Sequence, residues 1–359
     1  MPELPEVETV ARDLRRLVLG ATITGAEVGW SRTIRSGDPA AFEAAVRGRR
    51  IEDVGRRAKL VTLELSGGLV LTIHLKMTGQ IFVVPAGSPA DPYVRVSLAL
   101  DDGRVLRFRD IRKFGRMGLS TRDPVTGDLV GELGARGFKG FGPEPLDDAF
   151  GLRAFRQLLR RRKGRLKSLL TDQGFLAGVG NIYADEALWL ARLHPLRSAS
   201  SLKPSDERRL YEAIRVILAE AVERRGSSID DYTAPDGDGE MQERLKVYQR
   251  TGEPCPRCGR PIRRVIVGGR STHFCSWCQR LSAAERAGAQ AILRTAVPRA
   301  GSRSARGGRW TELLGGDGGV GLLPAERARN EAKARAERTR RAAATRRAAA
   351  RGSVSTRPA

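Results

Sequence analysis

The chain has 359 residues, 40% of them hydrophobic, which predicts two or three domains with cores of their own. Its formal net charge of +23 at pH 7 indicates a polyanionic partner such as a nucleic acid, without distinguishing DNA from RNA. No apolar run approaches the roughly 18 residues that a membrane helix needs. The acidic start Met-Pro-Glu-Leu-Pro-Glu is unlike a signal peptide, so we expect a cytoplasmic protein with no membrane partner.

The first 130 residues predict a β-rich domain that begins with one helix. Apolar residues at helical spacing predict an amphipathic helix over residues 5–19, namely Val7, Val10, Leu14 and Leu17. From about residue 23 to residue 120 the chain changes to short apolar runs separated by turns that contain Gly and Asp. The clearest runs are Leu60–Leu65, Leu69–His74 and Val94–Leu100. This texture indicates an antiparallel sandwich or barrel, and we assign residues 1–130 to an N-terminal β-sandwich domain.

A helical domain is predicted after a linker. Residues 131–148 are rich in Gly and Pro and indicate the linker, and residues 149–240 show helical patterning. The last helix of this stretch has Ser205 as its expected cap, acids in its first turn and Gly226 just beyond its end. Its apolar stripe consists of Leu210, Ile214, Ile217 and Leu218.

The four cysteines lie in two Cys-x-x-Cys pairs within a compact module that we place at residues 241–282. Sixteen residues separate the pairs, a spacing typical of a zinc site whose ligands would be Cys255, Cys258, Cys275 and Cys278. Four thiolates complete a tetrahedron and leave no position for water, so we expect one structural Zn²⁺. A redox dithiol or two disulfides are the alternatives, but no thioredoxin-like pattern surrounds either pair. Residues 263–272 predict a hairpin with Arg270 projecting from its tip.

Several motifs in one order resemble the formamidopyrimidine-DNA glycosylase family. They are the start Pro2-Glu3-Leu4-Pro5-Glu6, Lys59 at the end of Gly-Arg-Arg-Ala-Lys, the turn Gly178-Val-Gly-Asn-Ile-Tyr183 and the zinc finger. The resemblance runs from Pro2 to about Arg280. It implies an α+β multidomain fold, with an N-terminal helix and β-sandwich followed by a helix-two-turn-helix domain and the four-cysteine finger.

The resemblance also implies an activity. It indicates a monomeric, nucleoid-associated enzyme that removes oxidised purines, such as 8-oxoguanine and formamidopyrimidines, from damaged double-stranded DNA and cleaves the strand by β,δ-elimination. The start Pro-Glu-Leu-Pro-Glu resembles the oxidised-purine branch, whereas the endonuclease VIII branch usually has Pro-Glu-Gly-Pro-Glu.

The chemistry implied by the resemblance begins at Pro2. Removal of the initiator Met would leave a free secondary amine, which is a nucleophile when neutral. Its attack on the sugar would expel the base and give an iminium ion, which acts as an electron sink for the two eliminations. The resemblance assigns proton transfer to Glu3, proton donation in the first elimination to Lys59 and proton donation in the second to Arg270. Glu6 is a further candidate for orienting the sugar or a water molecule.

Each of these residues has a simpler interpretation when it is taken alone. Pro2 and Glu3 also suit the first turn of a helix, and Lys59 suits the solvated end of a strand. Their joint presence with the zinc finger and the Gly-Val-Gly-Asn turn favours catalysis.

A DNA glycosylase of this kind must flip the damaged nucleotide out of the duplex and fill the gap that it leaves. The resemblance assigns that wedge to Met77, Arg112 and Phe114, although Met77 and Phe114 would otherwise be ordinary core residues. It assigns the phosphate contacts to Arg162, Lys167 and Asn181. The three histidines, His74, His194 and His273, are expected to be structural.

The chain departs from the family pattern at three places. Tyr93 stands where many relatives have a DNA-contacting His, and Gly226-Ser-Ser228 stands where Gly-Gly-Thr-Thr is frequent. Residues 285–359 have no counterpart, are rich in Arg, Ala and Gly, and predict a disordered basic tail in which residues 324–350 become helical on a polyanion. We hypothesise that the tail adds non-specific DNA affinity through counterion release.

Two other functions compete with an oxidised-purine glycosylase. One is an endonuclease VIII-like glycosylase for oxidised pyrimidines, and the other is a non-catalytic DNA-binding zinc protein. The sequence argues against a non-catalytic protein, because binding alone does not need a free proline amine. It retains the full set of Pro2, Glu3, Lys59 and Arg270.

Overall fold

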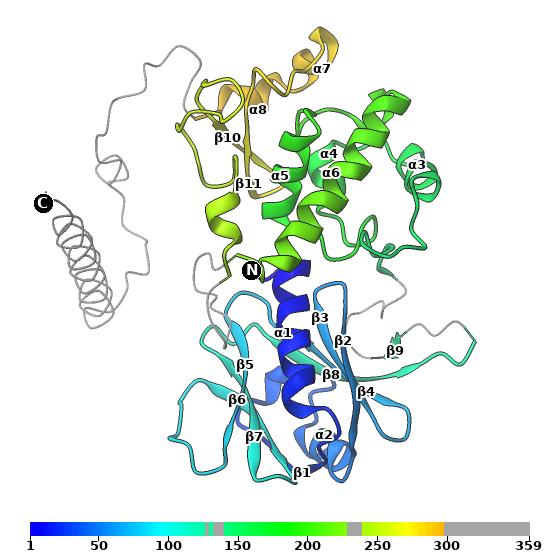
Figure 1. Ribbon diagram of the computed structural model, residues 1–359, viewed down its shortest axis with the longest axis vertical. Helices are drawn as coiled ribbons and strands as arrows, with labels where there is room; N and C mark the ends of the chain where they lie inside the picture. The colour runs from blue at the N-terminus through cyan, green and yellow to red at the C-terminus, as the bar shows by residue number, and fades with distance from the viewer. Residues whose placement is uncertain (126–128, 132–139, 228–238, 298–359) are drawn as a thin grey trace, which may run out of the picture. The chain divides into compact units, whose positions relative to one another are not determined.

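The computed structural model describes residues 1–125, 129–131, 140–227 and 239–297. Its N-terminal part is a sandwich of two antiparallel sheets (Figure 1). The four-stranded sheet has the order β1-β6-β7-β5, with β1 Ile23–Val28, β5 Gly79–Pro85, β6 Val94–Leu100 and β7 Arg104–Asp110. The five-stranded sheet has the order β2-β3-β4-β8-β9, with β2 Ile51–Arg57, β3 Leu60–Leu65, β4 Leu69–His74, β8 Arg116–Arg122 and β9 Leu129–Gly131. The sandwich prediction is therefore confirmed.

Apolar side chains of both sheets meet in one core. Leu98 and Phe108 come from one sheet, Leu63 and Ile73 come from the other, and all four are fully buried. Two short helices flank the strands, η1 Ser31–Thr33 and α2 Pro39–Val46. Burial alternates along β7, where Leu106, Phe108 and Asp110 are buried, whereas β3 and β4 each bury four consecutive residues.

Helix α1 spans Leu4–Val18 and packs against both the sandwich and the helical part of the chain. In Figure 1 it descends from the helices into the strands. Its buried stripe contains Val7, Val10 and Leu14, as predicted, but Leu17 is 39% exposed, so that part of the prediction is wrong. At 100° per residue Leu17 falls at the edge of the stripe, and Val18 takes the buried position instead.

The helical part has a separate core. Its elements are α3 Leu152–Arg160, α4 Leu166–Leu170, α5 Asn181–Leu190, η3 Ala199–Ser201, α6 Pro204–Glu223 and η4 Met241–Arg244. The predicted cap of the long helix α6 is wrong. Lys203 is the N-cap, and its backbone N–H donates to the Asp206 carboxylate at 3.2 Å. Pro204 explains the shift, because its fixed φ suits the first helical position and starts the helix before Ser205.

The last described residues contain the hairpin β10 Arg263–Val267 and β11 Arg270–Phe274, followed by α7 Ala283–Gly288 and α8 Gln290–Arg294. The disorder predicted from residue 285 onward is therefore wrong for residues 285–297. Ser282 caps α7 by accepting from the Glu285 N–H, and Ala289 and Ala296 pack into a small core against the hairpin. The rest of the predicted tail, with residues 324–350, lies outside the described residues. Within the described part, no helix is long and apolar enough to cross a membrane.

Candidate active site and nucleic-acid interface

One cleft of about 580 Å³ brings together all four predicted catalytic residues. Its lining includes Pro2, Glu3, Lys59 and Arg270, together with Met77 and Asn181 of the predicted DNA contacts. These residues come from the start of α1, the β2–β3 turn, the β4–β5 turn, the start of α5 and the tip of the β10–β11 hairpin. Segments that are far apart in the sequence therefore supply a single site.

Glu3 is held at the N-terminus of α5. Its side chain is 2% exposed, and its carboxylate accepts from the backbone N–H groups of Ile182 at 2.9 Å and Tyr183 at 3.4 Å. The unpaired N–H groups and the dipole of a helix N-terminus stabilise a carboxylate. Because Leu4 N–H also donates to the Gly178 carbonyl at 3.0 Å, the beginning of α1 is fixed against the Gly-Val-Gly-Asn turn.

Gly180 lets Glu3 and Lys59 approach the same turn. A Cβ at this position would overlap the Glu3 carboxylate and lie 2.6 Å from Lys59 Nζ. No side chain fits in so little space. The glycine is therefore required by the close approach of the two functional groups.

Lys59 is almost fully buried, with 6% of its surface exposed. Burial lowers its pKa below the ordinary value, while the negative charges of Glu3 and Glu6 act in the opposite direction. A lysine with a lowered pKa exchanges protons more readily near neutral pH than an exposed one. The preceding residue, Ala58, has φ +54°, so the backbone turns sharply just before the lysine.

Glu144, in the predicted linker, braces that turn. Its Oε1 accepts from Ala58 N–H at 2.7 Å and from Arg57 Nη1 at 2.7 Å, and its Oε2 lies 2.7 Å from Arg56 Nη1. Burial disfavours the charged form of Glu144, but Arg56 and these hydrogen bonds outweigh it and hold its pKa below the usual range. The linker thus positions Lys59 from outside the sandwich.

Both carboxylate oxygens of Glu6 accept hydrogen bonds from neighbouring residues. One carboxylate oxygen accepts from Glu3 N–H at 2.8 Å, and the other accepts from Ser227 N–H at 2.8 Å and from the Tyr183 hydroxyl. Burial, followed by the nearby charge of Glu3, raises the pKa of Glu6. These contacts tie the first turn of α1 to α5 and to the segment after α6.

Lys167 does not occupy the position predicted for a phosphate contact. Its side chain is 1% exposed, and Nζ lies 2.6 Å from Asp185 Oδ1 and donates to the Asn181 carbonyl at 2.7 Å. A buried ammonium whose charge is already paired is not available to a phosphate from solvent. The prediction that Lys167 contacts a phosphate is therefore wrong. Its Nζ instead binds Asn181 and Asp185 of α5.

Asp185 is a residue that the sequence pattern did not single out. Besides pairing with Lys167, it accepts from His273 N–H at 2.8 Å and lies 3.1 Å from His273 Nδ1. Asn181 Nδ2 donates to the Ser271 carbonyl at 2.9 Å, so two contacts join α5 to the hairpin that carries Arg270. An acid within the mostly apolar run Asn-Ile-Tyr-Ala-Asp-Glu-Ala-Leu is the signal that could have revealed it.

The predicted wedge residues lie on two adjoining loops. Phe114 is 48% exposed on the β7–β8 loop, so it is not a core residue, and the Arg112 guanidinium lies 5.1 Å from its ring centre. Met77 is half-buried at the cleft wall. Thr78 joins the loops, because its hydroxyl accepts from Arg112 N–H at 3.2 Å and donates to Asp110 at 2.5 Å.

Tyr93 and Arg162, like Arg112 and Phe114, do not line the cleft. Tyr93 is 38% exposed just before β6, with the Arg109 guanidinium 5.1 Å from its ring centre. Arg162 is exposed in the α3–α4 connection. Neither residue shares the cleft with Pro2.

The histidines have structural surroundings. Burial lowers the pKa values of His74 and His194 to about 3, so both are neutral at physiological pH. His74 Nδ1 accepts from Lys76 N–H at 3.1 Å, and His194 Nδ1 accepts from Leu196 N–H at 3.1 Å. With His273 bound to Asp185, each fits the structural role predicted for it.

The four cysteine sulfurs converge as a zinc site requires. Sγ of Cys255 and Cys278 are 3.9 Å apart, those of Cys258 and Cys275 are 3.4 Å apart, and all four sulfurs lie within 4.8 Å of one another. Zn–S bonds of about 2.3 Å in a tetrahedron place sulfurs about 3.8 Å apart. The residues therefore fit one structural zinc, and no sulfur pair is at disulfide distance.

We expect removal of zinc by a strong chelator to unfold the finger, because metal binding supplies roughly 10 kcal/mol or more to such small modules. Hydrogen–deuterium exchange should become fast between Cys255 and Cys278, including the hairpin with Arg270, while sandwich peptides stay protected. Continued protection of the finger after complete loss of zinc would contradict this expectation.

Three family models match consecutive parts of the chain. The formamidopyrimidine-DNA glycosylase N-terminal domain matches residues 1–117, the formamidopyrimidine-DNA glycosylase H2TH domain matches residues 141–233, and the zinc finger found in FPG and IleRS matches residues 252–281. Together they define the class, a DNA glycosylase with an H2TH domain and a zinc finger.

Individual relatives agree over the same region. A formamidopyrimidine-DNA glycosylase of Herpetosiphon aurantiacus is 48% identical over 281 residues, which cover 78% of this chain and all of the relative. Lactococcus lactis FPG in complex with abasic-site DNA has a TM-score of 0.70 at 36% identity, and a variant in complex with Fapy-dG containing DNA has a TM-score of 0.71 at 36% identity. Each comparison covers 78% of this chain and 100% of the other. The chain belongs to the formamidopyrimidine-DNA glycosylase family.

Proposed function

We propose that this chain excises oxidised purines, including 8-oxoguanine and formamidopyrimidines, from damaged duplex DNA as a monomer at the nucleoid, with Pro2 as its nucleophile, and then cleaves the strand at the abasic site. The observation that carries the proposal is the convergence of Pro2, Glu3, Lys59 and Arg270 on one cleft. Family membership supports the glycosylase and lyase activities, and the cleft supports the roles of the residues.

The first step requires a free Pro2 nitrogen. Met1 lines the same cleft, so its removal would open the space beside that nitrogen. The neutral amine attacks C1′ of the sugar, the bond to the damaged base breaks, and the base leaves with a proton. The C1′–O4′ bond then breaks as O4′ takes up a proton, which opens the sugar ring and leaves the C1′=N⁺ iminium ion. Glu3, fixed at the start of α5, is the group beside Pro2 that moves protons during this exchange.

The two eliminations then follow from the iminium ion. A tertiary iminium has no N–H to lose, so it remains an electron sink that acidifies the hydrogen at C2′. Loss of that proton expels the 3′ phosphate, and a second elimination expels the 5′ phosphate. Lys59, with its lowered pKa, donates a proton in the first elimination, and Arg270 does so in the second.

We assign extrusion of the lesion to the β4–β5 and β7–β8 loops. Phe114 and Met77 occupy the vacated space in the base stack, and Arg112 hydrogen-bonds the orphaned base. Arg162, Asn181 and Tyr93 contact the DNA strand that flanks the lesion, and the affinity that phosphate contacts supply depends on salt.

The substrate class is tested by a panel of duplexes with 8-oxoguanine, formamidopyrimidine or thymine glycol at one position. We expect base release and strand cleavage to be faster with the two purine lesions. Faster turnover of thymine glycol would favour the endonuclease VIII-like alternative, and binding without cleavage of any duplex would favour a non-catalytic DNA-binding protein. The zinc-replete full chain is used in every reaction.

A further inference from the structure

A second cavity, of about 640 Å³, lies between α7–α8 and the zinc finger, and it shares no lining residue with the catalytic cleft. Leu281, where the zinc-finger family model ends, lines one side, and residues of α7 and α8 line another. The polar lining residues are His194, Arg263, Ser276, Arg286, Gln290 and Arg294. This chain therefore builds the cavity with a segment that follows the family's matched region.

The cavity has an excess of positive charge. Three guanidinium groups line it, those of Arg263, Arg286 and Arg294, and its lining contains neither Asp nor Glu. None of the three forms an ion pair in the part of the chain that the structure describes. Arg263 Nε is shielded from solvent and has no hydrogen-bond acceptor among the described residues. An anion in the cavity would be stabilised by charge-assisted hydrogen bonds from these guanidinium groups, because the lining supplies no carboxylate to balance their charge.

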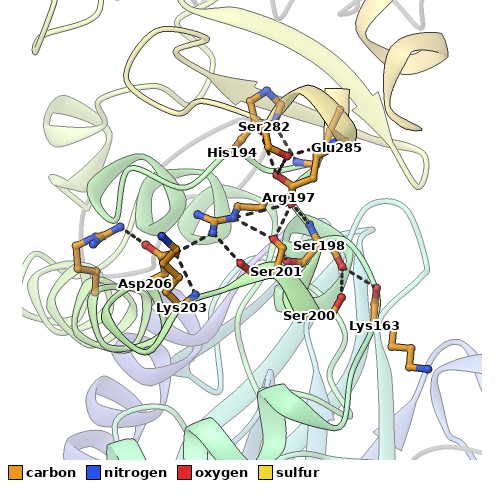
Figure 2. Close-up of polar contacts among 12 residues, drawn as sticks. Lys163, His194, Arg197, Ser198, Ser200, Ser201, Lys203, Asp206, Ser282 and Glu285 are labelled. Carbon is orange, nitrogen blue, oxygen red and sulfur yellow. Dashed lines mark hydrogen bonds and ion pairs between the residues drawn. The ribbon is translucent and has the colours of Figure 1, made fainter. Parts of the chain in front are cut away.

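Glu285, which precedes the cavity residue Arg286 in the chain, is hydrogen-bonded to other residues. The Glu285 carboxylate accepts from the Ser201 hydroxyl at 2.6 Å, from Ser198 N–H at 3.2 Å and from the Ser282 hydroxyl at 2.9 Å, as Figure 2 shows. Arg197 pairs more closely with Asp206 than with Glu285. Its Nη2 lies 2.8 Å from Asp206 Oδ2, whereas its Nε lies 3.9 Å from Glu285 Oε1. Glu285 thus fastens α7 to the helical part of the chain, and among the described residues its ion pair is with Arg197 and with none of the three cavity arginines.

We propose that this cavity binds a phosphate group. Arg263, Arg286 and Arg294 would surround it with guanidinium donors, and the Ser276 hydroxyl and Gln290 amide would supply neutral ones. The group belongs either to the DNA backbone or to a free phosphorylated molecule. The proposal does not depend on the chemistry at Pro2.

The first test measures binding of inorganic pyrophosphate by calorimetry in the presence of a saturating short lesion duplex, so that the catalytic cleft is occupied. Arg286→Gln/Arg294→Gln changes two exposed residues and should leave the fold intact, and Arg263→Gln is the second variant. Arg153→Gln/Arg208→Gln, in two exposed arginines of α3 and α6, is the charge-matched control. If the source is free phosphate, we expect both test variants to weaken pyrophosphate binding about tenfold and the control to retain it.

The second test measures the salt dependence of binding to duplexes of increasing length. If the source is the DNA backbone, the test variants should lower the slope of log K against log salt by about 0.9 for each phosphate that they no longer neutralise, on long duplexes only. A change in either assay beyond that of the control pair supports the site and identifies its ligand. Test variants that match the control in both assays would overturn the proposal.

Discussion

Gly180→Ala should lower the rate of base excision on the order of 100-fold or more, because the new Cβ would overlap the Glu3 carboxylate and lie 2.6 Å from Lys59 Nζ. Glu3 is bound to the N-terminus of α5 and Lys59 is buried, so moving either group aside would break the contacts that position it. A displacement of about 1 Å at a catalytic group costs roughly that factor. Single-turnover excision of 8-oxoguanine is the measurement.

Gly164→Ala is the matched control for this substitution. A Cβ at Gly164 would meet no atom within 4 Å, although the residue belongs to the same helical part of the chain. We expect near-normal excision and thermal stability in the control. Excision by Gly180→Ala at the control's rate would show that the close approach of Glu3 and Lys59 is not needed.

Lys59→Met should lower strand cleavage by a factor of about 10² to 10⁴, the usual contribution of a positioned acid or base. The proposed proton donor is the charged ammonium, and burial lowers its pKa. Cleavage by the native protein should therefore fall as pH rises through a value below the ordinary lysine pKa of 10.5. The residual cleavage of Lys59→Met should lack this alkaline decline.

A pH–rate series with preformed abasic-site DNA measures that effect separately from base excision. Lys163→Met, at an exposed lysine before α4, is the control and should keep the native profile. Native-like cleavage by Lys59→Met, with an unchanged alkaline decline, would remove Lys59 from the mechanism.

The sandwich was predictable because local pattern and final environment agree there. The runs Leu60–Leu65, Leu69–His74 and Val94–Leu100 coincide with β3, β4 and β6, since short apolar runs bounded by turn residues suit buried strands. The zinc ligands were predictable for a similar reason, as the spacing of two knuckles constrains the sulfur positions.

Two of the errors arose where a residue's partner is distant in sequence. Lys167 was predicted to contact a phosphate, but it is buried and paired with Asp185, 18 residues later. Residues 285–297 are rich in Ala and Arg, yet Ala289 and Ala296 find a hydrophobic surface on the hairpin. Charge and composition describe the residue itself, whereas burial depends on the surface that the fold brings to it.

The brace on Lys59 was missed for the same reason. Glu144 lies in a Gly- and Pro-rich stretch, where only the folded chain shows that it contacts Arg56, Arg57 and Ala58. The convergence of Pro2 with Arg270 likewise required the structure, although the resemblance had named both.

Borohydride trapping on an 8-oxoguanine duplex tests the central claim most directly. The native chain, with Met1 removed, should form a covalent adduct with the DNA, and peptide mapping should place the link at Pro2. A form that retains Met1, or Pro2→Gly in which the secondary amine is lost, should give little or no such adduct at this position. Equal trapping and equal strand cleavage by the form with a blocked terminus would contradict the account.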